Sequence, residues 1–446
     1  MKALEQQASE AVRLATDLGA TGAECTIVDG EEFSASVRLG EVEQLKQAGS
    51  RQAGIRVLVG KCSGSSYTSD LSKEGMDKMV RAALELARIT TEDPFAGLPE
   101  QCGTFSGDLG LYDPAIASLE TDAKIASAKI AEQSALSADP RIQNSEGASF
   151  ESYLGGRAFA NSLGFSGSYR TSSCGLSVVP VAKQNGSMER DYWHSASRFF
   201  AKVETPEAIG ARAAARALRR LNPRKVSTQR VPVVFEPRTA QSLLGDIFDA
   251  VNGSAIYRHA SFLAGKLGEK IASELLTVID DATMPGLFGS SPFDDEGVAS
   301  RRTVVIEKGV LKSYLLNSYS ARKLGLHSTG NASRGVSGNA GIGPGNFYVE
   351  AGQLGEEEIL KKVSNGLYVT ELIGASTSTV TGDYSSGAFG MWIENGELAY
   401  PVSEITIAGN LKQMLEQIQY VGSNLEFRGS IASPTLMIGE MMISGQ

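Results

Sequence analysis

The chain has 446 residues, 42% of them hydrophobic and 21% charged, a globular composition long enough for two or three domains. Its 51 acidic and 42 basic side chains give a formal net charge of -9, which disfavours non-specific binding to a nucleic-acid backbone. No stretch approaches the roughly 20 apolar residues of a membrane span, and the four cysteines form no CxxC pair. These features predict a soluble cytoplasmic protein with no direct contact to nucleic acid or membrane.

The first two hundred residues predict helices alternating with groups of strands. Residues 2–18 carry apolar side chains at helical spacing, and residues 24–68 then change to strand patterns with turns expected at Gly30, Gly40 and Gly60. Because the 49 glycines are scattered along the chain, we interpret them as turns between short strands. Further strands are expected within residues 145–184, and further helices at 71–90, 118–135 and 206–221.

A basic segment at residues 215–230 separates two halves of the chain. Its charges alternate with apolar residues, so we interpret it as a solvated helix face that runs into a linker. Asn222 and Pro223 break the helical pattern there. The sequence therefore predicts an N-terminal α+β domain at residues 1–222 and a C-terminal β-rich domain at residues 223–446.

The second half begins with a short apolar strand at 230–237 and an amphipathic helix at 239–253. Leu244, Ile247, Phe248 and Val251 form one face of this helix, and Asn252-Gly253 is expected to end it. Beyond it, hairpins are expected to turn at Lys308-Gly309 and Asn395-Gly396. The predicted fold is α+β and rich in antiparallel sheet, with an N-terminal α/β sandwich-like domain and a C-terminal twisted β-sheet with few helices.

Known catalytic motifs are not found in the sequence. There is no G-x-S-x-G elbow, the glycines at 341–346 do not fit a dinucleotide-binding frame, and no two of the three histidines are spaced to share a metal. The acidic groups at 280–281 and 294–296 could form an acid/base or cation site, but their spacing favours surface turns. These residues alone point to no catalytic centre.

The segment "VTGDYSSGAFGMWIENGE" nevertheless resembles the signature region of the TldD/PmbA family, which is known for modulators of DNA gyrase and for subunits of a cytoplasmic metalloprotease. The resemblance extends over 366–415, 293–325, "STGNASR" and the N-terminal segments 38–60 and 65–72, and so covers most of the chain. It implies a role connected with peptide cleavage.

Members of the TldD branch carry an HExxxH motif on the helix that corresponds to residues 239–253, where two histidines and a distant cysteine hold zinc. Here Phe248, Asp249 and Gly253 occupy the motif positions, and "EFRGSIASPTLMIGE" near the C-terminus contains no cysteine. Phenylalanine and glycine offer no metal-binding atom in their side chains. The resemblance therefore implies the PmbA (TldE) branch, with no zinc in this chain and zinc on a TldD-like partner.

The leading hypothesis is a non-catalytic subunit that shapes the cavity of a TldD/TldE-type peptidase acting on extended peptides, such as leader peptides or an antitoxin. The partner would be a zinc-bearing paralogue in a heterodimer, or a second copy in a homodimer. One alternative is a homo-oligomeric regulatory protein that binds gyrase or another protein, and another is a different hydrolase that uses residues 294–296. Candidate peptide-binding residues are Asp249, Tyr257, Arg258, His259, Asn331 and Arg334.

Overall fold

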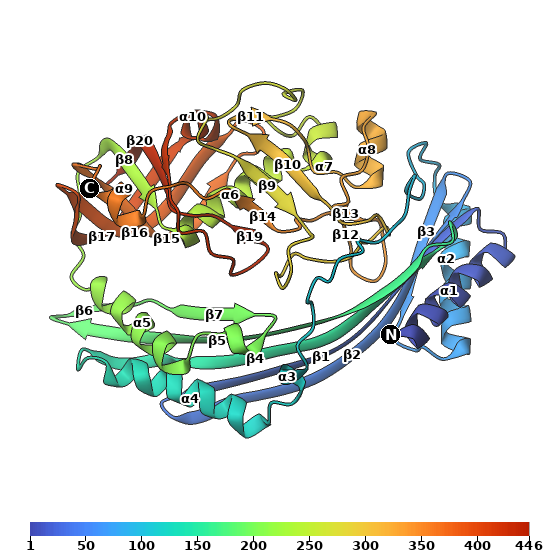
Figure 1. Ribbon diagram of the computed structural model, residues 1–446, viewed down its shortest axis with the longest axis horizontal. Coiled ribbons are helices and arrows are strands. Elements are labelled where there is room, and N and C mark those ends of the chain that lie inside the picture. The colour runs from blue at the N-terminus through green and yellow to red at the C-terminus, as the bar shows by residue number, and fades with distance from the viewer. Residues whose placement is uncertain (446) are drawn as a thin grey trace.

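The computed structural model describes residues 1–445, and its first half is built on one long, curved antiparallel sheet (Figure 1). The strands lie in the order β3-β2-β1-β4-β5-β6, and β7 also pairs with β5. Their bounds are β1 (Gly22–Arg38), β2 (Glu41–Val59), β3 (Cys62–Thr68), β4 (Ile142–Asn161), β5 (Ser166–Gln184), β6 (Ser187–Arg190) and β7 (Trp193–Ser197).

The expectation of short strands separated by glycine turns is wrong for this sheet. Strands β1, β2, β4 and β5 contain 17 to 20 residues each, and Gly30 lies inside β1 opposite Gly155 of β4. A Cβ atom would lie 2.9 Å from the Tyr153 ring at Gly30 and 2.2 Å from its hydroxyl oxygen at Gly155. These glycines make room for an aromatic side chain, whereas Gly40 and Gly60, with φ of +81° and +62°, do form the predicted turns.

Helices cover one face of the sheet in two separate groups. Alternate residues of β1 point to this face: Cys25 and Ile27 pack with α1 and α2, while Phe33 and Ala35 pack with α4 and α5. The helices expected in this half are all present. Their bounds are α1 (Lys2–Asp17), α2 (Lys73–Ile89), α3 (Pro114–Ala117), α4 (Thr121–Ser137) and α5 (Pro206–Arg219), with a 3-10 turn at Phe200–Lys202.

The C-terminal half lies over the opposite, concave face of the long sheet (Figure 1). Its main sheet has the order β17-β16-β15-β8-β20-β18, and a further pairing of β17 with β20 curls the sheet toward closure. A second sheet has the order β11-β10-β9-β14-β19, and β12 pairs with β13. The bounds of the main sheet are β8 (Gln229–Phe235), β15 (Asn365–Thr377), β16 (Asp383–Glu394), β17 (Glu397–Asn410), β18 (Ile418–Val421) and β20 (Leu436–Ser444).

The smaller elements complete this half. The remaining strands are β9 (Val278–Asp281), β10 (Arg302–Glu307), β11 (Val310–Leu311), β12 (Ala332–Ser333), β13 (Gly341–Ile342), β14 (Phe347–Val349) and β19 (Ile431–Ala432). The helices are α6 (Pro237–Val251), α7 (Gly253–Tyr257), α8 (Ser318–Leu324), α9 (Glu356–Leu360) and α10 (Leu411–Glu416). Both predicted hairpins are confirmed, since Lys308-Gly309 and Asn395-Gly396 connect β10 to β11 and β16 to β17 with positive φ. The fold is α+β and rich in antiparallel sheet, as predicted.

Buried ion pairs connect the two halves at one end of the molecule. The guanidinium group of Arg216 on α5 lies 2.8 Å from Glu236 and 3.1 Å from Asp191, and Arg220 pairs with Glu371 of β15. The side chains of Arg216 and Arg220 are only 8% and 9% exposed, so the interpretation of this segment as a solvated helix face is wrong. Sequence spacing could not reveal it, because most of the acidic partners come from distant segments.

A second buried network connects the halves near the start of β1 and the end of β4. Glu24 of β1 pairs with Arg56 at 2.8 Å and with Arg334 at 2.6 Å, and Arg157 of β4 pairs with Asp295 at 2.9 Å. The acidic segment 294–296 is therefore buried between the halves and is not the surface turn that its spacing favoured. The chain passes between the halves over residues 220–228, a segment that contains the predicted boundary between residues 222 and 223. The division into two domains stays a prediction.

No helix within residues 1–445 combines the length and apolar character needed to cross a bilayer.

Replacing Glu236 by alanine is expected to lower the free energy of unfolding by about 3 kcal/mol, because it leaves the buried Arg216 guanidinium partly unpaired. Urea denaturation followed by circular dichroism measures this change. Glu74→Ala removes an exposed ion pair with Lys78 and should cost less than about 1 kcal/mol. Equal losses for the two variants would contradict a special role for the buried pair.

Candidate functional site

A cavity of about 630 Å3 lies beside α6, the helix that the sequence comparison singled out. One stripe of α6 lines it, while Leu243, Leu244 and Ile247 on the other side of the helix are buried in the largest core. The opposite walls come from β7 and from the segment before β19. The lining residues are Tyr192, His194, Arg238, Gln241, Ser242, Gly245, Asp246, Phe248, Asp249, Arg428 and Ile431.

Helix α6 begins with Pro237, whose fixed φ suits a first helical position. Next to it the Thr239 hydroxyl lies 3.0 Å from the Glu236 carbonyl oxygen and 3.1 Å from that of Val369 in β15. The helix ends at Val251, close to the predicted position. Its start is thus fixed against the main sheet.

Helix α6 ends at Asn252-Gly253, as predicted, although Gly253 does not have the positive φ of a left-handed cap. The side chain of Asn252 accepts a hydrogen bond from the Ser254 amide at 2.9 Å, and Gly253 is the first residue of α7. A Cβ atom at this glycine would lie 2.4 Å from Leu316 and 3.0 Å from the Leu315 carbonyl oxygen. Close packing requires glycine here.

The three positions compared with the HExxxH motif do not fit a zinc ion. Phe248 is 8% exposed and packs edge-to-face on Phe347 with ring centroids 5.6 Å apart. Gly253 has no side chain and no space for one, so Asp249 is the single possible ligand of the three. Within residues 1–445, no group of three or more His, Cys, Asp or Glu side chains is placed to hold a metal ion.

Two arginines on opposite walls bring positive charge to the cavity. Arg238 of α6 stacks on Tyr192 at 4.0 Å from the ring centroid, and Arg428 stacks on Trp193 at 4.2 Å. Burial, together with the charges of Arg428 and Arg238, lowers the pKa of His194 to about 4. The imidazole is therefore neutral at pH 7.

Two carboxyl groups on α6 also line the cavity. Burial raises the pKa of Asp246 to about 6 against the effect of a hydrogen bond from Thr377, and the charge of Asp249 adds to the rise. Burial also raises the pKa of Asp249. Acidic and basic groups therefore both line the cavity, and this arrangement suits a polar ligand better than an apolar one.

The predicted residues that follow α6 lie outside this cavity. Tyr257 packs on Tyr319 of α8 with ring centroids 5.8 Å apart, and the Nε atom of Arg258 donates to the Tyr257 hydroxyl at 3.1 Å. His259 is exposed, with φ of +54°. Of the six candidate peptide-binding residues, only Asp249 lines the cavity.

Asn331 and Arg334 are buried in or beside the network between the halves. The amide nitrogen of Asn331 donates to Asp280 at 2.7 Å, and Arg334 pairs with Glu24. Although burial opposes ionisation, the charges of Arg334 and Arg56 hold the pKa of Glu24 below its ordinary value. Through these contacts both residues stabilise the fold.

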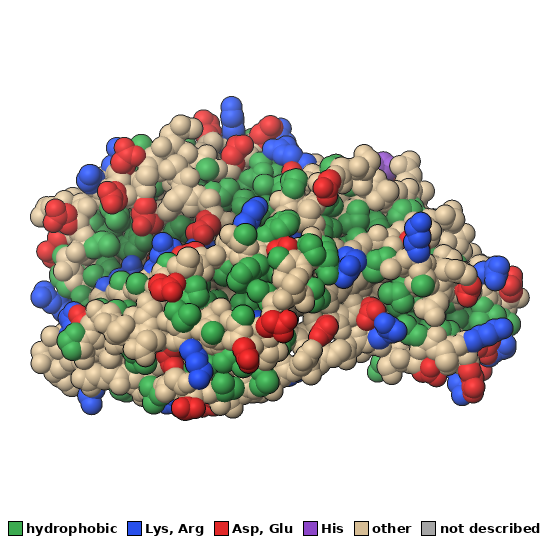
Figure 2. All heavy atoms as spheres, turned by 60° about the horizontal axis from the view of Figure 1, so that its bottom comes forward, with side chains coloured by type: hydrophobic (Ala, Val, Ile, Leu, Met, Phe, Trp, Pro, Cys, Tyr) green, Lys and Arg blue, Asp and Glu red, His purple; other side chains and the backbone are tan. Residues whose placement is uncertain are grey.

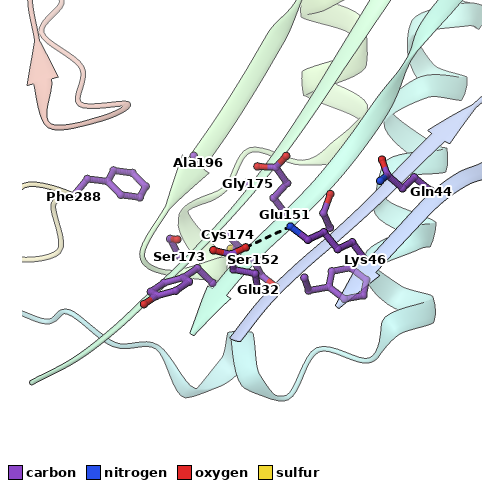
Figure 3. A pocket seen from close by; sticks show the side chains of 13 residues that line it. Glu32, Gln44, Lys46, Glu151, Ser152, Ser173, Cys174, Gly175, Ala196 and Phe288 are labelled. Atoms are coloured by element: carbon purple, nitrogen blue, oxygen red, sulfur yellow. Dashed lines mark ion pairs between the residues drawn. The ribbon is translucent and has the colours of Figure 1, made fainter. Parts of the chain in front are cut away.

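A second hollow, of about 590 Å3, lies on the concave face of the long sheet (Figure 3). Residues of β1, β2, β4 and β5 line it, including the aromatic Phe33 and Tyr153, and Phe288 of the C-terminal half lies across from them. Lys46 and Glu32 form an ion pair at 3.8 Å in this hollow. Cys174 is 3% exposed and burial raises its pKa to about 12, so its thiol is not a nucleophile at neutral pH.

Several lining residues of the cavity beside α6 are absent from the sequence prediction. Asp246 and Arg238 share a helix stripe with Asp249, so helical spacing could have identified them. Other lining residues come from distant segments of the chain, namely Tyr192, His194 and Arg428. The sequence around them does not predict that they lie beside α6. Figure 2 shows acidic and basic side chains interspersed over the face turned forward, with no continuous basic surface on that face.

The chain belongs to the PmbA/TldD metallopeptidase family. Three family models match it in order along the chain: PmbA/TldA metallopeptidase domain 1 over residues 23–87, the central domain over 114–221 and the C-terminal domain over 228–445. Together they span both halves of the fold and include the cavity beside α6.

Among its relatives is Metalloprotease PmbA of Escherichia coli O157:H7, which is 42% identical over 447 residues that cover 100% of this chain and 97% of the relative. The Metalloprotease PmbA homolog of Haemophilus influenzae is 37% identical, over 99% and 96% of the two chains. A crystal structure from Bacteroides thetaiotaomicron, of a protein proposed to be a modulator of DNA gyrase, superposes with a TM-score of 0.91 at 29% identity, over 99% and 98% of the chains. TldE of Thermococcus kodakarensis shares the fold, with a TM-score of 0.89 at 23% identity, over 98% and 100% of the chains.

Asp246→Asn is expected to stabilise the protein at neutral pH by about 1 kcal/mol. This is less than the pKa shift alone would give, because the carboxyl group is partly exposed and water screens its charge. The folded pKa of about 6 lies above the ordinary value of 3.8, so ionisation costs stability above pH 6. This cost shrinks as the pH falls from 6 toward 3.8, so the variant should have lost most of its advantage by about pH 4. Urea denaturation at both pH values measures the difference, with exposed Asp17→Asn as control. A gain that is independent of pH would contradict the assigned shift.

Gly253→Ala is expected to destabilise the protein by about 2 kcal/mol, because the new methyl group overlaps Leu316 and the Leu315 carbonyl oxygen. Gly245→Ala provides the control inside α6. No atom lies within 4 Å of a Cβ there, and replacing a helical glycine should stabilise by up to about 1 kcal/mol. Thermal denaturation of the two variants should therefore shift in opposite directions, and a shift in the same direction would refute the packing assignment.

Proposed function

We propose that this chain is a zinc-free, non-catalytic subunit of a TldD/TldE-type peptidase that cleaves extended or unfolded peptides. The observation that carries the proposal is the packing at α6, where Phe248 contacts Phe347 and Gly253 contacts Leu316. Packed side chains thus occupy the space at both positions compared with the histidines of HExxxH, and a cavity lies beside them. A chain with this site requires a partner to supply zinc, and we propose a TldD-like paralogue that carries HExxxH.

The cavity beside α6 is the proposed contact with the peptide. The carboxyl groups of Asp246 and Asp249 suit an ammonium group or a basic side chain, and Arg238 and Arg428 suit a carboxylate. Tyr257, Arg258 and His259 lie outside the cavity on exposed or partly exposed surface, and Asn331 and Arg334 hold the halves together. We therefore narrow the proposed peptide contacts among the six predicted residues to Asp249.

Co-expression with a HExxxH-bearing paralogue tests this proposal. The expected result is co-purification of the two chains, zinc bound by the paralogue alone, and chelator-sensitive cleavage of unfolded peptides by the mixture. The control is the paralogue with its HExxxH glutamate replaced. A mixture of this variant with the present chain should show no cleavage. Chelator-sensitive peptidase activity of this chain by itself would overturn the proposal.

A regulatory role toward gyrase is the second candidate, because a structurally similar protein from Bacteroides thetaiotaomicron is proposed to be a modulator of DNA gyrase. An affinity purification with this chain as bait separates the two candidates. Recovery of gyrase subunits without a HExxxH-bearing chain would favour regulation, and recovery of that chain would favour the peptidase.

A further inference from the structure

A further cavity, of about 390 Å3, lies where the two halves of the chain meet. One face of α5 lines it, together with the start of α6 and the segment 424–428. Five arginines line this cavity, which we call the arginine pocket: Arg212, Arg216, Arg219, Arg238 and Arg428. The three on α5 are four and three residues apart, so helical spacing places them on one face of that helix. Arg238 and Arg428 also line the neighbouring cavity beside α6.

Most of the carboxyl groups in and around the arginine pocket are already committed to three of the five arginines. The pairs, at 2.8 to 3.2 Å, are Arg212 with Glu204, Arg216 with Glu236 and Asp191, and Arg428 with Glu426. Glu356, which also lines the pocket, accepts a hydrogen bond from the Thr435 hydroxyl at 2.7 Å. These carboxylates therefore have their main partners elsewhere than on the remaining two arginines.

Arg219 and Arg238 have hydrogen-bond donors to spare. The Nη2 atom of Arg219 lies 3.5 Å from Glu236, the one hydrogen bond of this guanidinium group within residues 1–445. Its Nε atom is buried and has no partner among those residues. The Nη1 atom of Arg238 donates to the Tyr192 carbonyl oxygen at 3.5 Å and lies 3.9 Å from Asp191. A guanidinium group has five N–H donors, so most of those on these two side chains are unused.

Both guanidinium groups are also partly removed from water. The side chain of Arg219 is 27% exposed and that of Arg238 is 16% exposed. Arg238 is held in place by stacking on Tyr192, with its guanidinium carbon 4.0 Å from the ring centroid. A charge that is half withdrawn from water and lacks a close counter-ion costs free energy. A bound anion would recover this cost.

The chemistry of the two side chains defines the kind of anion. The planar fork of an arginine matches the two oxygens of a carboxylate or of a phosphate group, and binds either with two parallel hydrogen bonds. Arg219 belongs to α5 of the first half, and Arg238 belongs to α6 of the second half. An anion between them would therefore connect the two halves.

From these observations we propose that the arginine pocket binds an oxyanion, a carboxylate or a phosphate group, between Arg219 and Arg238. The ion pairs of Arg212, Arg216 and Arg428 hold the walls of the pocket, and the two less committed arginines supply the hydrogen bonds to the ligand. The inference concerns this chain alone and does not rest on the proposed function.

Isothermal titration calorimetry of the full chain with sodium phosphate tests the site, with the ionic strength held constant by sodium chloride. Wild-type protein is expected to bind phosphate saturably. Arg219→Gln and Arg238→Gln each remove one fork and should weaken binding about tenfold. Arg219→Lys keeps the charge but not the fork and should recover only part of the affinity. Arg13→Gln, at an exposed position of α1, is the control and should bind as the wild type does.

A blocked tripeptide with a central glutamate is the second probe, and it separates the two sources of the oxyanion. The probe that binds more tightly identifies the source as a phosphate or as a carboxylate, and its affinity should fall in both glutamine variants. Circular dichroism spectra of the variants show that they are folded. Absence of saturable binding by both probes, or equal affinities of Arg219→Gln, Arg238→Gln and Arg13→Gln, is incompatible with the proposed site.

Discussion

The arrangement of the two halves depends on arginine side chains that are buried beside carboxylates. Arg216 brings together Asp191 of the first half and Glu236 of the second, and Glu236 is the residue immediately before α6. A charge removed from water is tolerated only where oppositely charged and hydrogen-bonding partners surround it, so these contacts admit few alternative geometries. The position of the cavity helix relative to the long sheet is therefore set by ion pairs as well as by apolar packing.

The cavity beside α6 lies next to packing contacts that leave no room for a zinc ion at the positions of Phe248 and Gly253. A zinc site requires ligand atoms directed at one point, whereas Phe248 here contributes a ring to the core and Gly253 allows α7 to approach Leu315 and Leu316. The open stripe of α6 carries polar residues such as Gln241, Ser242 and Asp246. Phe248 and Asp249 both line the cavity, so the packing that leaves no room for a metal ion and the polar stripe of α6 belong to the same site.

Glycine has two different roles in the long sheet, and these roles explain the error in the predicted strand lengths. At Gly40 and Gly60 the chain reverses with positive φ, as the sequence suggested. At Gly30 and Gly155 the backbone is extended, and the absent side chains leave space for Tyr153. A glycine in the sequence looks the same in both settings, since only the neighbouring strand decides which role it has.

The sequence by itself determined the elements whose cause is local. The periodicity of apolar residues gave the helices at 73–89, 121–137 and 206–219, and Asn395-Gly396 gave the hairpin between β16 and β17. The segment around "VTGDYSSGAFGMWIENGE" was sufficient to indicate the family. Only the tertiary structure decided that Arg216, Arg220 and the acidic segment 294–296 are buried, and that Tyr192, His194 and Arg428 share a cavity with Asp249. Burial of a side chain and pairing between distant segments depend on the packing of the whole chain. A local sequence pattern therefore does not predict them.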